Sequence, residues 1–131
     1  MASNQNNEKA QYNLGVIYYD KQSVFFDINK SIKYFTLACK NGLADAQYQL
    51  GFIYYEGIFV VQDIEKSLYY ISLAANNNLS KAQFFLGFTY YEGKYVKRDI
   101  KKSIFYFLLA ANQNFDKAQF LLGIIYFEGK Y

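Results

Sequence analysis

The sequence predicts an all-α protein, a right-handed solenoid of about seven helices stacked as antiparallel pairs. A block of pattern Ala-Gln-(Tyr/Phe)-x-Leu-Gly-x-x-Tyr-(Tyr/Phe) begins at Ala10, Ala46, Ala82 and Ala118, so its copies lie 36 residues apart. A fixed period of this kind is typical of stacked repeat arrays. Apolar residues recur at helical spacing within each period, and the chain has no proline to interrupt a helix.

The period divides the chain into five segments. Residues 1–7 are polar, and we expect them to be disordered. Repeats follow at 8–43, 44–79 and 80–115, and residues 116–131 form a half repeat with a first helix only. These three and a half 36-residue repeats should form one continuous solenoid domain, because each repeat of an array packs on its neighbours.

Each complete repeat should contain two helices. In the first repeat, Ala10, Leu14 and Ile17 fall on one helical face and predict a helix over residues 8–19. Ile28, Ile32 and Phe35 predict a second helix over residues 28–40. The same spacing recurs in the later repeats, and the half repeat carries only the first helix.

Polar and small residues mark the predicted helix ends. An aspartate precedes each second helix, where its carboxylate can accept hydrogen bonds from free backbone N–H groups; these are Asp27, Asp63 and Asp99. Each second helix should end at a residue of left-handed conformation, at Gly42, Asn78 and Asn114.

A glycine column lies inside the first helices, at Gly15, Gly51, Gly87 and Gly123. A glycine in a helix costs about 1 kcal/mol relative to alanine. Its presence in all four copies predicts close packing of the paired helix at this position. We therefore assign the glycines, like the three aspartates, a structural role.

These residues resemble a known family, the Sel-like repeat, which is a longer-looped relative of the tetratricopeptide repeat. One repeat carries its pattern at Ala46, Leu50, Gly51, Tyr54, Gly57, Val60, Asp63, Lys66, Ala74 and Ala75, and the next repeat carries it 36 residues later. The chain departs from the pattern at Lys21, where a glycine is expected, and at Ser31, Ser67 and Ser103, where alanine is usual. The tetratricopeptide repeat itself fits less well, since its period is about 34 residues.

The resemblance implies adaptor work, and the composition argues against catalysis. The 131-residue chain has no histidine and one cysteine, so the commonest general base and a thiolate metal site are both excluded. We expect no enzyme activity, no cofactor and no metal. No segment reads as a signal peptide or a membrane span, so we expect a soluble protein that is cytoplasmic by default.

An aromatic ladder is the candidate binding site. By analogy with tetratricopeptide arrays, the first helices should line a concave face with Tyr12, Val16, Tyr19, Tyr48, Phe52, Tyr55, Phe84, Phe88, Tyr91, Phe120, Ile124 and Phe127. Rigid rings suit a peptide or protein partner with apolar anchors. The same spacing also fits rings that pack mainly on adjacent repeats, so both interpretations stay open.

Two further surfaces give alternative functions. A basic patch surrounds the third interhelical loop, at Lys94, Lys97, Arg98, Lys101 and Lys102. Such a run is more often a solvated face, so we do not expect nucleic acid as the partner, although a basic-patch nucleic-acid binder stays an alternative. The second alternative is a structural module that self-associates through an open C-terminal helix.

Overall fold

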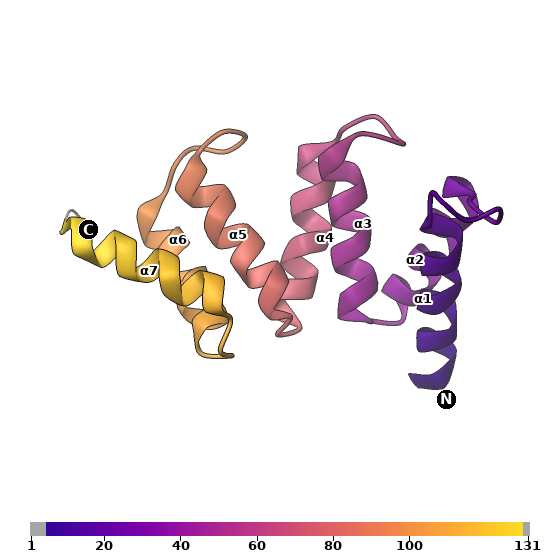
Figure 1. Cartoon of the computed structure of the whole chain (residues 1–131), viewed down its shortest axis with the longest axis horizontal. Helices are drawn as coiled ribbons and strands as arrows, with labels where there is room; N and C mark the ends of the chain where they lie inside the picture. The colour runs from indigo at the N-terminus through magenta and orange to yellow at the C-terminus, as the bar shows by residue number, and fades with distance from the viewer. Residues whose placement is uncertain (1–4, 130–131) are drawn as a thin grey trace. The chain divides into compact units, whose positions relative to one another are not determined.

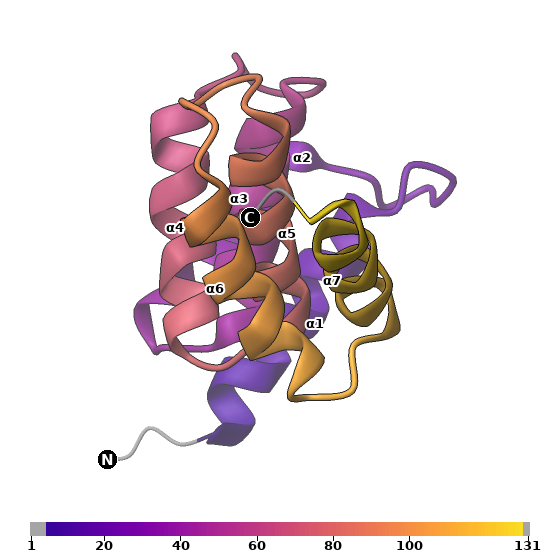
Figure 2. The same cartoon turned by 90° about the vertical axis from the view of Figure 1, so that its left-hand side faces the viewer.

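Residues 5–129 are described by the structure, a computed structural model shown in Figure 1. They form seven α-helices and no β-strand: α1 (Gln5–Tyr19), α2 (Ile28–Lys40), α3 (Ala44–Glu56), α4 (Ile64–Asn76), α5 (Ser80–Glu92), α6 (Ile100–Ala111) and α7 (Asp116–Glu128). Successive helices pair as α1 with α2, α3 with α4 and α5 with α6 (Figures 1 and 2). The predicted all-α repeat fold is confirmed.

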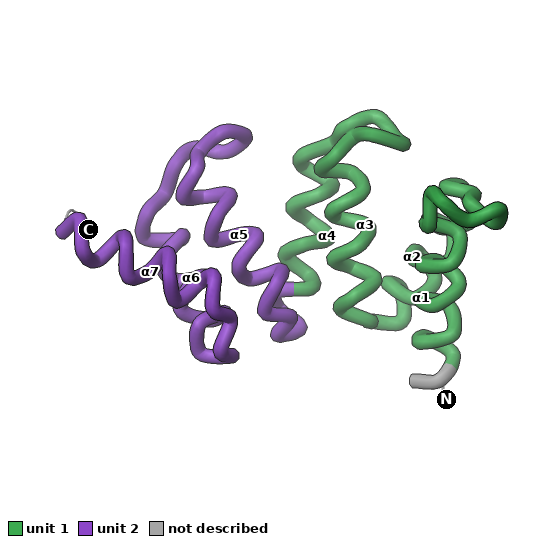
Figure 3. The backbone as a smooth tube through the Cα atoms, in the orientation of Figure 1, with its two compact units in different colours: residues 1–74 green, residues 75–131 purple. Residues whose placement is uncertain are grey.

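The chain divides into two compact units, residues 1–74 and 75–131, where the sequence predicts one continuous domain (Figure 3). The boundary falls near the end of α4, at Ala74 and Ala75. Each unit has a buried core formed where a helix pair meets the next helix. In unit 1 the core is Phe35, Ala38, Ala46, Leu50 and Ile53, and in unit 2 it is Phe107, Ala110, Ala118, Leu122 and Ile125.

Helix α1 begins at Gln5, earlier than the sequence predicts. Residues 5–7 are therefore helical, which corrects the expectation of a disordered segment, while residues 1–4 lie outside the described part of the chain. Glu8 lies in the first turn of α1, where a carboxylate interacts favourably with the positive end of the helix dipole.

The polar residues at the helix ends adopt the geometry that the sequence predicts. The side chains of Asp27, Asp63 and Asp99 each accept a hydrogen bond from the backbone N–H of the third residue beyond, at 3.1, 3.0 and 3.1 Å. Positive φ values occur at Gly42, Asn78 and Asn114. Each second helix is therefore followed by a residue that tolerates the left-handed conformation.

The first interhelical loop differs from the other two, as the lysine at position 21 suggests. Helices α3 and α5 end on Gly57 and Gly93, which have φ values of 66° and 69°, whereas Lys21 has no such conformation. The first loop instead turns through hydrogen bonds of its own, such as Ser23 N–H to the Asp20 carbonyl at 3.0 Å. The loop conformation changes, but the helix pair that it joins does not.

Candidate functional site

The ladder residues of α1 pack against the second helix of their own repeat. The ring centroids of Tyr12 and Tyr19 lie 5.6 and 6.4 Å from that of Phe35, which is fully buried. Burial raises the pKa of both phenols, and the nearby carboxylates Asp45 and Glu56 raise them further. Only the middle position of this column, Val16, is largely open to solvent, with 43% of its surface exposed.

Unit 2 repeats this arrangement on α5. Phe84 and Tyr91 lie on either side of Phe107, with ring centroids 5.6 and 6.5 Å away. Phe84 also packs on Phe115 at 5.2 Å. Phe88, in the middle position, remains exposed. On α1 and α5 the outer rings of the column therefore act as a clamp for a buried side chain of the second helix, and the middle position faces outward. On α3 the middle residue, Phe52, is half-buried and stacks on Tyr48 with ring centroids 6.2 Å apart.

The outer ladder residues of α7 are far more exposed than their equivalents. Phe120 is 69% exposed and Phe127 is 91% exposed, while Ile124 is partly buried. No described residue takes the place that Phe35 and Phe107 occupy in the earlier repeats. Helix α7 therefore presents an open clamp.

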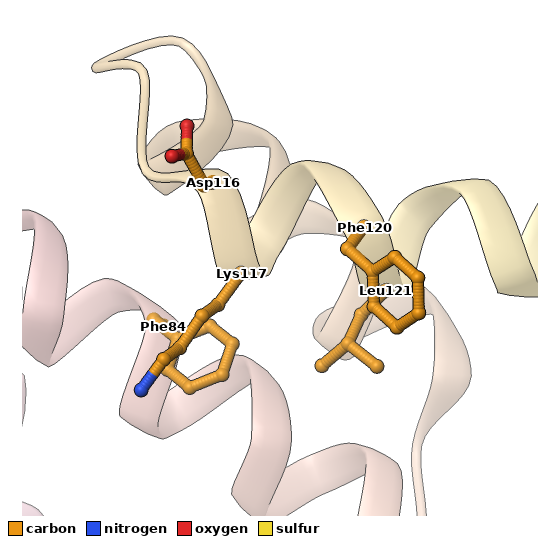
Figure 4. A pocket seen from close by; sticks show the side chains of 5 residues that line it. All are labelled: Phe84, Asp116, Lys117, Phe120 and Leu121. Carbon is orange, nitrogen blue, oxygen red and sulfur yellow. The ribbon is translucent and has the colours of Figure 1, made fainter.

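A pocket of about 400 Å³ lies beside α7, lined by Phe84, Asp116, Lys117, Phe120 and Leu121. Figure 4 shows Lys117 extending toward Phe84, with Phe120 and Leu121 further along α7 and the Asp116 carboxylate pointing away from the other four side chains. The lining is almost entirely apolar, with one charge of each sign from the first turn of α7. Such a pocket can hold an apolar side chain of a ligand.

The sequence identifies only part of this pocket. Phe84 and Phe120 belong to the predicted ladder, whereas Asp116, Lys117 and Leu121 do not. Leu121 stands in the column of Asn13, Gln49 and Phe85. Because that column mixes polar and apolar residues, the sequence does not identify Leu121 as a binding residue. The pair Asp116 and Lys117 reads as an ordinary helix start.

The basic patch is partly engaged within unit 2. Three of its five side chains lie over tyrosine rings at 5.0–5.4 Å: Lys94 over Tyr95, Arg98 over Tyr91 and Lys102 over Tyr90. Arg98 Nε also donates a hydrogen bond to the Tyr91 carbonyl at 2.9 Å. Lys97 and Lys101 are exposed. These contacts give the patch a role in holding the third loop, and nucleic-acid binding there stays an alternative prediction.

Residues 5–129 do not bring together three or more His, Cys, Asp or Glu side chains in a way that could hold a metal ion. Within the same range, no helix is long and apolar enough to cross a membrane. Cys39 is half-buried against the core of unit 1, and burial raises the pKa of its thiol. The thiolate, which is the reactive form of cysteine, is therefore disfavoured.

The helix pairs, their glycine column and their aspartate caps together define a repeat of known type. The family model of the Sel1 repeat matches residues 8–43, 44–79, 80–115 and 116–131. The chain belongs to the Sel1 repeat family. Sel1 repeats form a non-catalytic scaffold fold that generally serves protein–protein interaction.

Solved structures of Sel1 repeat proteins are similar to this chain. A Sel1 repeat protein from Oxalobacter formigenes is 32% identical, with a TM-score of 0.86 over 95% of this chain and 51% of the other. The protective antigen c5321 of uropathogenic Escherichia coli is 31% identical, with a TM-score of 0.87 over 95% of this chain and 27% of the other. The chain thus spans about half and about a quarter of these two Sel1 proteins.

Similarity to a third structure shows the fold alone. Cysteine-rich protein B of Helicobacter pylori is 23% identical, with a TM-score of 0.73 over 89% of this Sel1 chain and 95% of the other. None of the curated proteins matches the sequence.

Proposed function

We propose that this Sel1 repeat chain is a scaffold that binds a peptide or protein partner through its aromatic ladder, with the pocket beside α7 as the main anchor site. The observation that carries the proposal is the pocket itself, where Phe84, Phe120 and Leu121 form an apolar lining next to the charged side chain of Lys117. A partner would place an apolar side chain in the pocket and an acidic group near the lysine.

The energetics favour an apolar anchor. Full burial of a leucine or phenylalanine side chain stabilises a complex by about 1.5–3 kcal/mol relative to leaving it exposed. Phe88 and Phe120 add exposed ring surface on α5 and α7, and rings are ordered at low entropic cost. The charge of Lys117 would then select among apolar peptides, because an acidic group at the rim of the pocket adds a favourable contact.

Selection of displayed random peptides on the purified 131-residue chain tests this proposal. We expect the selected peptides to share a large apolar residue with an acidic neighbour. Leu121→Ala and Lys117→Glu should each weaken their binding, Leu121→Ala by about tenfold because part of the pocket lining is lost. Phe105→Ala is the matched control, since Phe105 is an exposed ring on α6 that does not line the pocket.

The opposite pattern of results would refute the proposal. If Leu121→Ala and Lys117→Glu bind the selected peptides as the native chain does, the pocket is not the binding site. If Phe105→Ala abolishes binding, the site lies on the outer face of α6 instead. Circular dichroism of each variant separates loss of binding from loss of folding.

A further inference from the structure

A pocket of about 300 Å³ lies in unit 2 where the loop from α5 meets the start of α6 (Figure 1). Three positive charges against one negative leave its lining with a formal charge of +2. The lining residues are Tyr90, Val96, Lys97, Arg98, Asp99 and Lys102. None of them lines the pocket beside α7, so the two pockets are separate sites.

Part of this lining belongs to the structure that every complete repeat shares. Lys102 lies over the ring of Tyr90 at 5.0 Å, as Lys66 lies over Tyr54 at 4.7 Å in the middle repeat. Asp99 caps the second helix here, as the equivalent aspartates do in the other repeats. These three residues therefore do not by themselves indicate a ligand.

The charge of Arg98, in contrast, is not needed to hold the loop. Arg98 Nε donates a hydrogen bond to the Tyr91 carbonyl at 2.9 Å. At the equivalent position of the middle repeat, Gln62 Nε2 donates to the Tyr55 carbonyl at 2.8 Å. A Cβ built on the glycine that follows the first helix would lie 2.7 Å from Arg98 Cβ and 2.6 Å from Gln62 Cβ, so the two loops place these side chains alike. A neutral side chain thus serves the loop equally well.

Lys97 also has uncharged counterparts. Its position is taken by Val61 in the middle repeat, and both side chains are exposed. In the first repeat, Phe25 and Phe26 stand in the positions of Lys97 and Arg98. The six equivalent positions of the middle repeat carry one lysine and one aspartate, so their formal charge is zero. The third repeat alone among the three complete repeats has a cationic pocket, and the packing of the repeat does not explain it.

The charge of the pocket indicates the class of ligand. A phosphate monoester carries a charge of about −1.5 to −2 at pH 7, which matches the lining, whereas a carboxylate or a phosphate diester carries a single negative charge. Lysine and arginine bind phosphate through charge-assisted hydrogen bonds. Tyr90 and Val96 are half-buried, and they give the pocket an apolar wall for the carbon atoms that carry the phosphate.

We propose that this pocket binds a phosphorylated side chain of a partner protein. Lys97 and Arg98 bind the phosphate oxygens, and Lys102 adds the third positive charge. A protein is the expected carrier because Sel1 repeats generally serve protein–protein interaction. A nucleic-acid strand fits less well, since it requires cations spaced along several successive phosphates. The site does not depend on peptide binding beside α7, so either proposal can fail without the other.

An NMR titration of the isotope-labelled 131-residue chain tests this proposal, with N-acetyl-O-phosphotyrosine amide as the probe. We expect saturable shifts of the backbone amides of Val96, Lys97 and Arg98. Lys97→Val combined with Arg98→Gln should weaken binding by about tenfold or more, because two charge-assisted contacts are lost. This double variant should fold normally, since Val61 and Gln62 occupy the same positions in a loop of the same form.

The matched control removes two positive charges from the same region without changing the pocket lining. Lys94→Gln combined with Lys101→Gln lowers the net charge by the same amount, and neither residue lines the pocket. We expect the control to bind the probe within about twofold of the native chain at about 0.1 M salt, because salt screens exposed charges. Equal losses in the two double variants would overturn the proposal, since the probe would then respond only to the general positive charge of the loop.

A change of probe tests the choice of a phosphate monoester. N-acetyl-O-sulfotyrosine amide has the same shape but a single negative charge, so it should bind more weakly at about pH 7.5. The difference should disappear at about pH 5, below the second phosphate pKa of about 6. The chain has no histidine that would titrate in this range. Equal binding of the two probes at about pH 7.5 would refute the assignment to a phosphate monoester.

Two further ligands decide the source of the phosphate. Inorganic phosphate should bind more weakly than the phosphotyrosine probe, and equal binding would overturn the assignment to a protein side chain, because the carrier would then contribute nothing. A single-stranded oligonucleotide is the other competitor. If it binds, if both double variants weaken its binding and if the phosphotyrosine probe does not bind, nucleic acid is the ligand of the basic patch and the proposal is wrong.

Discussion

Gly87 on α5 and Gly123 on α7 hold equivalent places in successive repeats, yet their surroundings are opposite. A Cβ on Gly87 would lie 2.5 Å from Phe107 Cδ1, whereas one on Gly123 would meet no described atom within 4 Å. The aromatic rings that flank the two glycines differ in the same way. Phe84 and Tyr91 pack against Phe107, whereas Phe120 and Phe127 are exposed. A glycine of this column therefore marks the position where a second helix packs on the first. Helix α7 has the glycine too, although no second helix packs on it among the described residues.

The largest effect should come from removing the ring that closes the α5 clamp. Phe107 has no exposed surface, so Phe107→Ala should lower the free energy of unfolding by about 3–5 kcal/mol. Phe127→Ala should change it by less than about 0.5 kcal/mol, because that ring is 91% exposed. Urea unfolding followed by circular dichroism measures both. Similar losses for the two variants would show that α7 is covered in solution.

The second comparison adds a methyl group to Gly51, which the second helix of its repeat covers, and to Gly123, which no described atom covers. In Gly51→Ala the new Cβ would contact Ile71 and would lie 2.9 Å from the Ser67 carbonyl oxygen, which is backbone and cannot move away cheaply. Overpacking costs about 1–3 kcal/mol, so we expect a net loss of stability. Gly123→Ala should instead gain up to about 1 kcal/mol from helix propensity, because the site is open.

Thermal or urea unfolding of the two variants side by side gives the sign of each change. A stabilised Gly51→Ala would mean that α3 and α4 are not in close contact. A destabilised Gly123→Ala would mean that a second chain already occupies the face of α7.

The fold could be predicted largely from the sequence because the four copies of one block carry the same signal. The limits 8–19 and 28–40 of the first two helices agree with the structure except at the start of α1, and the aspartates and left-handed residues mark the ends. The division into two compact units could not be predicted, because nothing in the sequence changes in character at Ala74 and Ala75.

The site was harder to predict, because a column of rings does not reveal which of its members touch one another. The alternation of clamping and outward-facing positions, with Phe84 and Tyr91 packed and Phe88 exposed, depends on the second helix. The role of the serines was also missed. In the sequence Ser31, Ser67 and Ser103 are departures from the family pattern, and only the structure shows their hydrogen bonds to glycine carbonyls.

A smaller effect should follow from removing one of those hydroxyl groups. Ser103→Ala takes away the 2.8 Å hydrogen bond to Gly87 and leaves the apolar contacts of α6 in place. We expect a loss of about 0.5–1.5 kcal/mol, the usual net value of one hydrogen bond. Ser67→Ala in unit 1 should give a similar loss, since Ser67 also donates a buried hydrogen bond to a glycine carbonyl, that of Gly51, at 2.6 Å. An unchanged or increased stability in both would mean that alanine serves this column equally well.

The smallest effect should appear only at high pH, at a ladder position where the two units differ in chemistry. Burial raises the pKa of Tyr48, whereas Phe84 in the same column of unit 2 cannot ionise. A raised pKa means that the folded state holds the phenol proton more tightly than the unfolded chain does. The resulting stability is fully present below the ordinary tyrosine pKa of about 10 and is lost as the pH rises through the folded value.

Tyr48→Phe should therefore unfold like the native chain near neutral pH and lose less stability above about pH 10. Urea unfolding at a series of pH values measures this difference, with Tyr12→Phe as a second case of the same sign. Each variant would still lose some stability at alkaline pH, because burial also raises the pKa of Tyr19 and Tyr70, which both variants keep. Identical pH profiles for the native chain and Tyr48→Phe would show that this phenol is in contact with water, and the α3 column would then be as open as that of α7.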